Sequence, residues 1–433
     1  MKAISFLGTN NYTETTYVYV NGAQEITCTT PYFAEALATF FPELDQIYVL
    51  VTPAVQVHSN LAALKSRLGE RCQVVPIPSG HSEPELWKIF DALIAVVEEG
   101  DHVIFDITNS FRSLPFLTFL AAAYLRTAQQ VKVEKITYGA FEARDLDANR
   151  TPVFDLTPFI TLLDWLTATN QFIYTGDGRY LARLITAADT FEHPRRRLTP
   201  EEREAELVSK RIRGAAHAIE ETSLALLTSL IPHAEQASYK LVERLQDAAE
   251  ALAAQAPPYR MLAERIRATY APFSAAAPMQ DDLLADLKLQ RAMVRWYLDK
   301  GHLPQAFTLM REWVVSAVGY RLGIRDQRIL AHGDERYKIE EALGWAKQGL
   351  IEPQLLEVPP SEWAERLGAL PGFKDLATFW NRLVDLRNLI NHGAMRAAWE
   401  QTPVKTVVDN SETLYTQFEA LVPVLLEDPT CLS

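Results

Sequence analysis

Strand-like segments alternate with helix-like segments over the first 160 residues of this 433-residue chain. The strand-like segments are rich in β-branched and aromatic residues, and the stretches between them carry apolar residues at helical spacing. Alternation of this kind predicts a largely parallel α/β sheet with helices on its faces. The expected strands are Ala3–Leu7, Thr16–Val20, Gln46–Val51, Gln73–Ile77, His102–Ile107 and Val131–Tyr138, and helices are expected near 31–41, 53–68, 84–98 and 113–127.

Polar, glycine-bearing loops follow three of the expected strands, at 8–12, 106–115 and 138–142. Ligands of such sheets bind beyond the carboxyl ends of the strands, and a helix opened by Pro115 would offer backbone N–H groups to a phosphate. The alternative is that Thr108 and Ser110 only cap that helix and that Arg112 pairs with Asp106. The first loop lacks the glycine trio of a dinucleotide site. The candidate ligand-binding residues are Gly8, Thr9, Asn10, Asn11, Asp106, Thr108, Asn109, Ser110, Phe111, Arg112, Tyr138 and Gly139.

Composition narrows the class of protein. The apolar content of 48% and the charged content of 22% are typical of globular chains. A net charge of −13 argues against a broad, non-specific grip on nucleic acid, although a local basic cleft stays compatible with it. Three scattered cysteines indicate neither a disulfide framework nor a metal site. The first residues have a strand pattern rather than that of a secretory leader, and the longest apolar run is too short for a membrane span, so we expect a soluble cytoplasmic protein.

Helical periodicity dominates the second half of the chain. We therefore expect three parts: an α/β domain at 1–165, a connector at 166–200 with Gly and Pro breaks, and an all-helical domain at 201–433. At the start of the helical part, Thr199 precedes Pro200, Glu201 and Glu202, a pattern that predicts an N-cap followed by an acidic first turn.

A polar motif, Arg387-Asn388 followed by His392, ends an apolar helix pattern near the C-terminus. Arg387 and His392 diverge by about 140° around a helix, so two such helices related by a two-fold axis would be needed to bring both pairs into one cleft. Arg and His suit cleavage of RNA by its own 2′-hydroxyl, with His as general acid or base and Arg holding the phosphate. The alternative is that His392 only caps the helix or packs in the core. The expected dimer interface is the apolar face with Trp380, Leu383 and Leu386.

These motifs resemble those of a known family. The opening Phe6-Leu7-Gly8-Thr9, the run from Asp106 to Pro115 and the pair Tyr138-Gly139 together resemble the CARF domains of CRISPR-associated accessory proteins. The run is similar to the family pattern Asp, hydrophobic, Thr, His, Gly, Phe, Arg, small, Leu, Pro, with Asn109-Ser110 where His-Gly is common. The motif at 387–392 resembles that of HEPN ribonucleases. A sensor followed by such an effector resembles the RNases of type III CRISPR defence over essentially the whole chain.

The resemblance implies a Rossmann-like CARF sensor at 1–165 and a helical HEPN domain at 201–433. It implies a homodimer, or a higher oligomer, that binds a cyclic oligoadenylate, first of all cyclic tetra-adenylate, as an allosteric activator and uses no cofactor. The expected activity is metal-independent cleavage of single-stranded RNA, with Arg387, Asn388 and His392 as catalytic residues. Two alternatives stay open: a nucleotide-sensing regulator that does not cut, and a ring nuclease that degrades the cyclic oligoadenylate.

Overall fold

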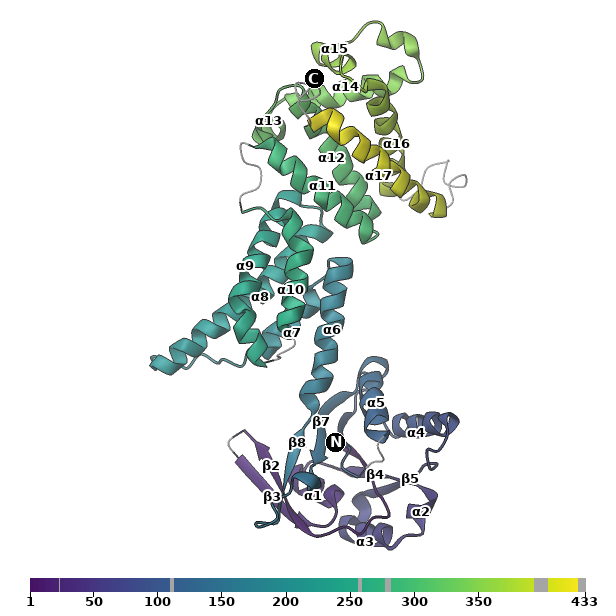
Figure 1. Cartoon of the computed structure of the whole chain (residues 1–433), viewed down its shortest axis with the longest axis vertical. Coiled ribbons are helices and arrows are strands. Elements are labelled where there is room, and N and C mark those ends of the chain that lie inside the picture. The colour runs from purple at the N-terminus through teal and green to yellow at the C-terminus, as the bar shows by residue number, and fades with distance from the viewer. Residues whose placement is uncertain (23, 110–112, 256–258, 277–281, 393–403, 427–433) are drawn as a thin grey trace. The chain divides into compact units, whose positions relative to one another are not determined.

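The computed structural model describes residues 1–22, 24–109, 113–255, 259–276, 282–392 and 404–426. The chain divides into two compact units, Met1–Asp164 and Trp165–Ser433. The first is an α/β unit and the second is helical in its described residues (Figure 1). None of the helices in these described ranges is long and apolar enough to span a membrane.

The first unit is built on an eight-stranded sheet with the strand order β3-β2-β8-β7-β6-β1-β4-β5. Five of the seven neighbouring pairs are parallel, and the pairs β2–β3 and β7–β8 are antiparallel. The strands are β1 (Lys2–Phe6), β2 (Thr15–Asn21), β3 (Gln24–Thr30), β4 (Gln46–Val51), β5 (Cys72–Pro76), β6 (His102–Asp106), β7 (Lys132–Gly139) and β8 (Arg150–Asp155).

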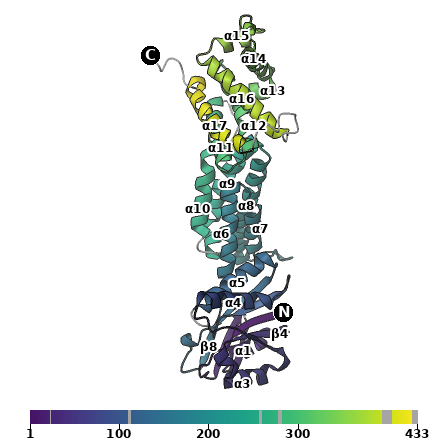
Figure 2. The same ribbon diagram turned by 90° about the vertical axis from the view of Figure 1, so that its right-hand side faces the viewer.

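Helices cover both faces of this sheet (Figures 1 and 2). Successive strand residues point to opposite faces, so Ala3 packs in one apolar cluster with α1 and α3, and Ile4 packs in another with α4 and α5. Burial on both faces explains the near-continuous apolar sequence of the central strands. The helices are α1 (Phe33–Phe40), α2 (Pro53–Gln56), α3 (Ser59–Leu68), α4 (Glu83–Ala95) and α5 (Leu114–Ala128).

All six expected strands are present, but β3 and β8 were not expected. Strand β3 forms a hairpin with β2 across Gly22, whose φ of 62° favours glycine. Strand β8 runs parallel to β2 and antiparallel to β7. The sheet is therefore mixed and, as predicted, largely parallel. The helix expected at 53–68 is two helices, because His58 has an extended backbone and acts as the N-cap of α3.

The described residues of the second unit share one apolar core. Helix α6 crosses the boundary between the units and is followed by helices up to α17. The helices are α6 (Thr157–Thr175), α7 (Arg179–Ala188), α8 (Pro200–Leu227), α9 (Ile231–Gln255), α10 (Tyr259–Tyr270), α11 (Leu283–Asp299), α12 (Leu303–Arg321), α13 (Gln327–His332), α14 (Glu335–Gly349), α15 (Glu362–Gly368), α16 (Phe373–Asn391) and α17 (Val404–Leu426).

The stretch 166–200, expected to be a connector, is largely helical. It contains the end of α6 and all of α7, and Phe172, Leu181 and Ile185 from these helices are fully buried in the core of the second unit. The predicted start of α8 is confirmed. Thr199 accepts a hydrogen bond from the Glu202 N–H at 3.3 Å, and the Glu202 carboxylate accepts one from the Thr199 N–H at 2.8 Å.

Candidate functional site

A cavity of about 390 Å³ lies at the carboxyl edge of β1, β6 and β7. These strands are parallel neighbours, so the loops that follow them emerge at the same edge of the sheet. The structure thus brings together residues from all three predicted loops. The predicted residues that line the cavity are Gly8, Thr9, Asn10, Asn11, Thr108, Asn109 and Gly139; Tyr12, Thr13, Tyr17, Pro31, Phe141 and Glu142 line it as well.

Asp106 fixes the loop after β6 from beneath this cavity. Its carboxylate is fully buried and accepts hydrogen bonds from the Ser5 hydroxyl at 2.5 Å and from the Thr108 N–H at 2.7 Å. Burial raises the pKa of the Asp106 carboxyl to about 6, and the two hydrogen bonds oppose that shift. Asp106 therefore positions the loop and does not itself line the cavity.

The Thr108 hydroxyl connects the second loop to the third. It accepts a hydrogen bond from the Gly139 N–H at 2.8 Å, and the N-cap residue of α5 is Ser113, not Thr108. The alternative that Thr108 only caps that helix is therefore wrong. Ser110, Phe111 and Arg112 lie outside the described residues.

Asn60, at the start of α3, holds the first loop in place. Its side-chain amide donates hydrogen bonds to the carbonyl oxygens of Gly8 at 3.0 Å and Asn10 at 2.9 Å. Within the loop, the Gly8 N–H donates to the Tyr12 hydroxyl at 2.7 Å. Asn60 was not a candidate from its sequence context, because an isolated Asn near a helix start is typical of local capping.

An aromatic wall closes one side of the cavity. The ring of Tyr17 packs edge-on against Phe33, with 5.0 Å between ring centres. A Cβ atom on Gly139 would lie 2.7 Å from Phe33, so only glycine fits there. Burial raises the pKa of Tyr12 to about 12, which keeps its phenol neutral and able to donate a hydrogen bond.

Tyr138 lies outside the cavity lining, although it was a candidate. Side chains alternate along β7, so Tyr138 and Gly139 face opposite sides of the sheet. The Tyr138 hydroxyl donates a hydrogen bond to the Glu142 carboxylate at 2.7 Å instead. The aromatic residue that the third loop brings to the cavity is Phe141.

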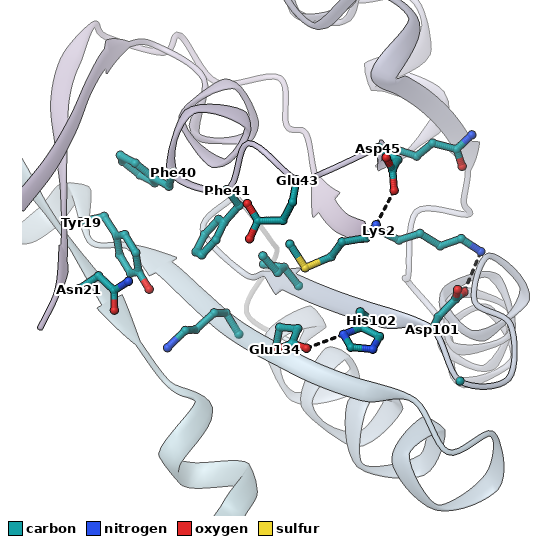
Figure 3. A pocket seen from close by; sticks show the side chains of 15 residues that line it. Lys2, Tyr19, Asn21, Phe40, Phe41, Glu43, Asp45, Asp101, His102 and Glu134 are labelled. Carbon is teal, nitrogen blue, oxygen red and sulfur yellow. Dashed lines mark hydrogen bonds and ion pairs between the residues drawn. The ribbon is translucent and has the colours of Figure 1, made fainter. Parts of the chain in front are cut away.

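A larger hollow, of about 760 Å³, lies at the opposite, amino edge of the sheet (Figure 3). Charged groups in it pair with one another: Lys2 lies 2.7 Å from Asp101, and His102 lies 2.6 Å from Glu134. Because Lys2, Asp101 and Glu134 already have partners within the protein, we assign the candidate ligand site to the smaller cavity.

The predicted catalytic residues lie at the end of α16. Arg387 donates a hydrogen bond to the Asn388 side-chain oxygen at 3.2 Å. The Arg387 Nε atom is buried without a hydrogen-bond partner, and Arg387 forms no ion pair with a carboxylate of the described ranges. The His392 N–H donates to the Asn388 carbonyl at 3.0 Å, which closes the helix, while the His392 side chain is exposed. The alternative that His392 packs in the core is therefore wrong, whereas His392 does occupy the C-cap position of α16.

Two of the three residues of the expected dimer interface, on the apolar face of α16, are covered within the chain. Trp380 is 4% exposed and Leu383 is fully buried, both in the core that α12 and α17 share with α16. The guanidinium of Arg311 lies 5.5 Å from the centre of the Trp380 ring. Leu386 is partly buried and lines a groove of about 570 Å³ against α17.

Taken together, these observations describe an α/β unit with a cavity at the carboxyl edge of its sheet, followed along the chain by a helical unit. Over 125 residues the chain is 30% identical to CRISPR-associated protein MJ1674 of Methanocaldococcus jannaschii. The match covers 28% of this chain and 19% of that protein, so the chain spans about a fifth of this relative's length in the match. No protein-family model matches the chain. Within the described ranges, no group of three or more His, Cys, Asp or Glu residues is placed to hold a metal ion.

Proposed function

We propose that this chain is a CRISPR-associated endoribonuclease that is activated by a cyclic oligoadenylate and cuts single-stranded RNA. The similarity to CRISPR-associated protein MJ1674 supports the CRISPR association. The observation that carries the nuclease is the partly buried Arg387, which lies beside Asn388 and has no carboxylate partner in the described ranges. A guanidinium in this state suits the binding of a phosphate oxygen.

The proposed reaction needs an arginine and a histidine, and no metal ion. Arg387 holds the scissile phosphate, and His392 accepts the proton of the neighbouring 2′-hydroxyl. The 2′-oxygen then attacks phosphorus, the bond to the 5′-oxygen breaks, and the leaving oxygen takes a proton from water, while the protonated His392 releases its proton to the solvent. The products are a 2′,3′-cyclic phosphate and a 5′-hydroxyl. The divergence of Arg387 and His392 on one helix is the reason for a homodimer.

In this proposal the cyclic oligoadenylate binds a CARF-like sensor at the carboxyl edge of the sheet. The hydroxyl of Thr108 and the amides of Asn10 and Asn11 offer hydrogen bonds there, and Tyr12 and Tyr17 offer ring faces and edges. The ligand shifts the dimer toward its cutting state only as far as it binds that state more tightly than the inactive one. Cyclic tetra-adenylate is the first ligand to try.

The test is to incubate purified chain with each cyclic oligoadenylate and a labelled single-stranded RNA, with and without EDTA. We expect one ring size to trigger cleavage, EDTA to leave it in place, and mass spectrometry to find 2′,3′-cyclic phosphate ends. Ligand binding without RNA cleavage under any condition would favour a regulator. Loss of the cyclic oligoadenylate with the RNA intact would favour a ring nuclease.

A further inference from the structure

A second cavity, of about 450 Å³, lies within the helical unit between α9, α11, α12, α13 and α14. Neither Arg387 nor His392 lines it. Its walls are largely apolar, with Pro232, Leu309 and Leu330 among the lining residues. Its volume is within the range of small-molecule sites, which are apolar cavities with a few well-placed polar groups.

Three polar side chains from three different helices reach this cavity: Gln290 from α11, Ser316 from α12 and Gln327 from α13. Gln290 is 7% exposed and Ser316 is 2% exposed, yet neither side chain forms a hydrogen bond with another residue of the described ranges. The Gln327 Oε1 atom is buried and also lacks a partner there. A buried polar atom without a partner destabilises a fold, and the Gln327 Oε1 atom is one. Together with the largely buried Gln290 and Ser316 on the same cavity, it points to a ligand that supplies hydrogen bonds.

Besides His233, the ionisable residues that line the cavity are Glu312 and Arg336, which carry opposite charges. Glu312 and Arg336, which line it, form an ion pair, and Arg311 and Glu340 extend this pair into a network of two cations and two anions. A cavity with balanced charges favours an uncharged ligand, or the uncharged part of a larger one.

We propose that this cavity binds an unstacked nucleobase. A Gln side chain presents a donor and an acceptor side by side, which matches the edge of adenine, and the flat faces of a base fit apolar walls. Proteins read single-stranded RNA through bases that are splayed out of the strand in this way. The base can come from the RNA substrate, and in that case the inference rests on the proposed function. It can also come from a free nucleoside, which offers the same hydrogen-bonding groups and flat faces.

The decisive variant is Gln290→Leu in the full chain, because it removes the amide and keeps the side-chain size. The probes are a short single-stranded RNA with one adenine in a uridine run, the same strand with an abasic site at that position, and free adenosine. Binding is measured by fluorescence anisotropy for the strands and by calorimetry for adenosine, without activator. The matched control is Gln236→Leu, at an exposed position of α9.

We expect Gln290→Leu to weaken binding of the adenine strand at least tenfold, to the level of the abasic strand, while Gln236→Leu binds like wild type. The melting temperature of Gln290→Leu should stay unchanged or rise, because an unpaired buried amide has been removed. If Gln290→Leu is destabilised instead, Ala331→Phe fills the cavity from an exposed lining position and should give the same loss of binding. Equal binding of the adenine and abasic strands by wild type would overturn the proposal.

The source of the base and the proposed function are separated by the same measurements. Adenosine binding that Gln290→Leu abolishes identifies a free nucleoside as a ligand, whereas strand binding alone identifies the base of an RNA. If adenine bound in the sensor cavity instead, Gln290→Leu and Gln236→Leu would bind it equally. Such binding therefore could not produce a loss specific to Gln290→Leu. If Gln290→Leu cleaves RNA on activation and binds the adenine strand and adenosine like wild type, the base pocket is refuted and the proposed nuclease is supported. Binding that depends on Gln290, without any RNA cleavage, supports the base pocket and refutes the proposed nuclease.

Discussion

Asp106 positions the binding loops although it lies beneath the cavity. Its carboxylate is buried and bonded to Ser5 of β1 and to the Thr108 N–H, and the Thr108 hydroxyl in turn binds the Gly139 N–H of β7. A single buried acid thereby sets the geometry of residues on three neighbouring strands. Asp106, predicted from the sequence as a ligand-binding residue, thus supports the loops, and its neighbours Thr108 and Asn109 line the cavity.

Asp106→Asn should flatten the dependence of stability on pH. The pKa of the Asp106 carboxyl rises from 3.8 to about 6 on folding, so between these values the folded state keeps a proton that the unfolded state has lost. The stabilisation from that proton is fully present below pH 3.8 and is lost as pH rises through about 6. An Asn side chain can still accept from Thr108 and donate to Ser5, and it does not titrate.

Urea unfolding measured across this pH range checks the prediction. Wild type should lose on the order of 1–3 kcal/mol from low to high pH relative to Asp106→Asn. Parallel curves for the two proteins would mean that the Asp106 carboxyl ionises normally in the folded chain.

His392→Ala and Arg387→Ala should each reduce activated RNA cleavage by about 10²–10⁴-fold, because one removes proton transfer and the other removes the phosphate clamp. Folding should stay intact by circular dichroism, since His392 is exposed and Arg387 has no carboxylate partner in the described ranges. The matched control is Arg382→Ala, an exposed cation on the same helix. Wild-type turnover in either motif variant would rule out the assignment.

At the scale of elements, α3 holds the first binding loop through Asn60. Asn60→Ala removes both hydrogen bonds to the loop, at Gly8 and Asn10, and should raise the activating concentration of cyclic oligoadenylate while maximal cleavage is unchanged. Stability should fall by about 1–2 kcal/mol. Ser66→Ala, at an exposed position of α3, is the control. An unchanged activation curve together with lower stability would limit Asn60 to a structural role.

Helices α16 and α5 differ in the solvent exposure of their apolar side chains. On α16, Leu383 is fully buried, whereas α5 exposes Phe116, Leu120 and Tyr124, four residues apart and therefore on one stripe. Exposed apolar stripes are typical of association surfaces. We therefore expect the homodimer of the proposed function to use α5 rather than the face of α16.

Phe116→Asp should shift the chain from dimer to monomer in sedimentation velocity with little change in melting temperature. Leu383→Ala should lower the free energy of unfolding by about 2–5 kcal/mol, because it leaves a cavity in the core. If Phe116→Asp sediments as wild type, the dimer uses another surface.

For the whole molecule, the proposed active site is shared between two chains. Mixing Arg387→Ala chains with His392→Ala chains yields heterodimers that carry one Arg387 and one His392, from opposite copies. Partial cleavage by the mixture, with none by either parent, is the expected result. Heterodimers that form, as shown by mass spectrometry, and remain inactive would mean that every chain must supply both residues. An active monomer would exclude the shared site.

The sequence alone was sufficient where a structural signal is local. Apolar runs predicted β1, β4 and β6, the polar loops after three strands predicted one binding edge, and the pattern at Thr199 predicted the start of α8. Each of these signals depends on side chains within a few residues of one another, so periodicity and capping chemistry are enough to identify them.

The tertiary structure decided what depends on residues distant in the sequence. Strand β3 exposes much of its polar sequence and is fixed by the hairpin with β2, while β8 is fixed by pairing with β2 and β7. Asn60 binds a loop about fifty residues away. Gln290 and Gln327 line the same cavity only because α11 and α13 both border it. The apolar face of α16 predicted burial correctly, but only packing could decide that α12 and α17 of the same chain cover it. The physical reason is that amphipathic spacing specifies which face of a helix leaves water and does not specify its partner.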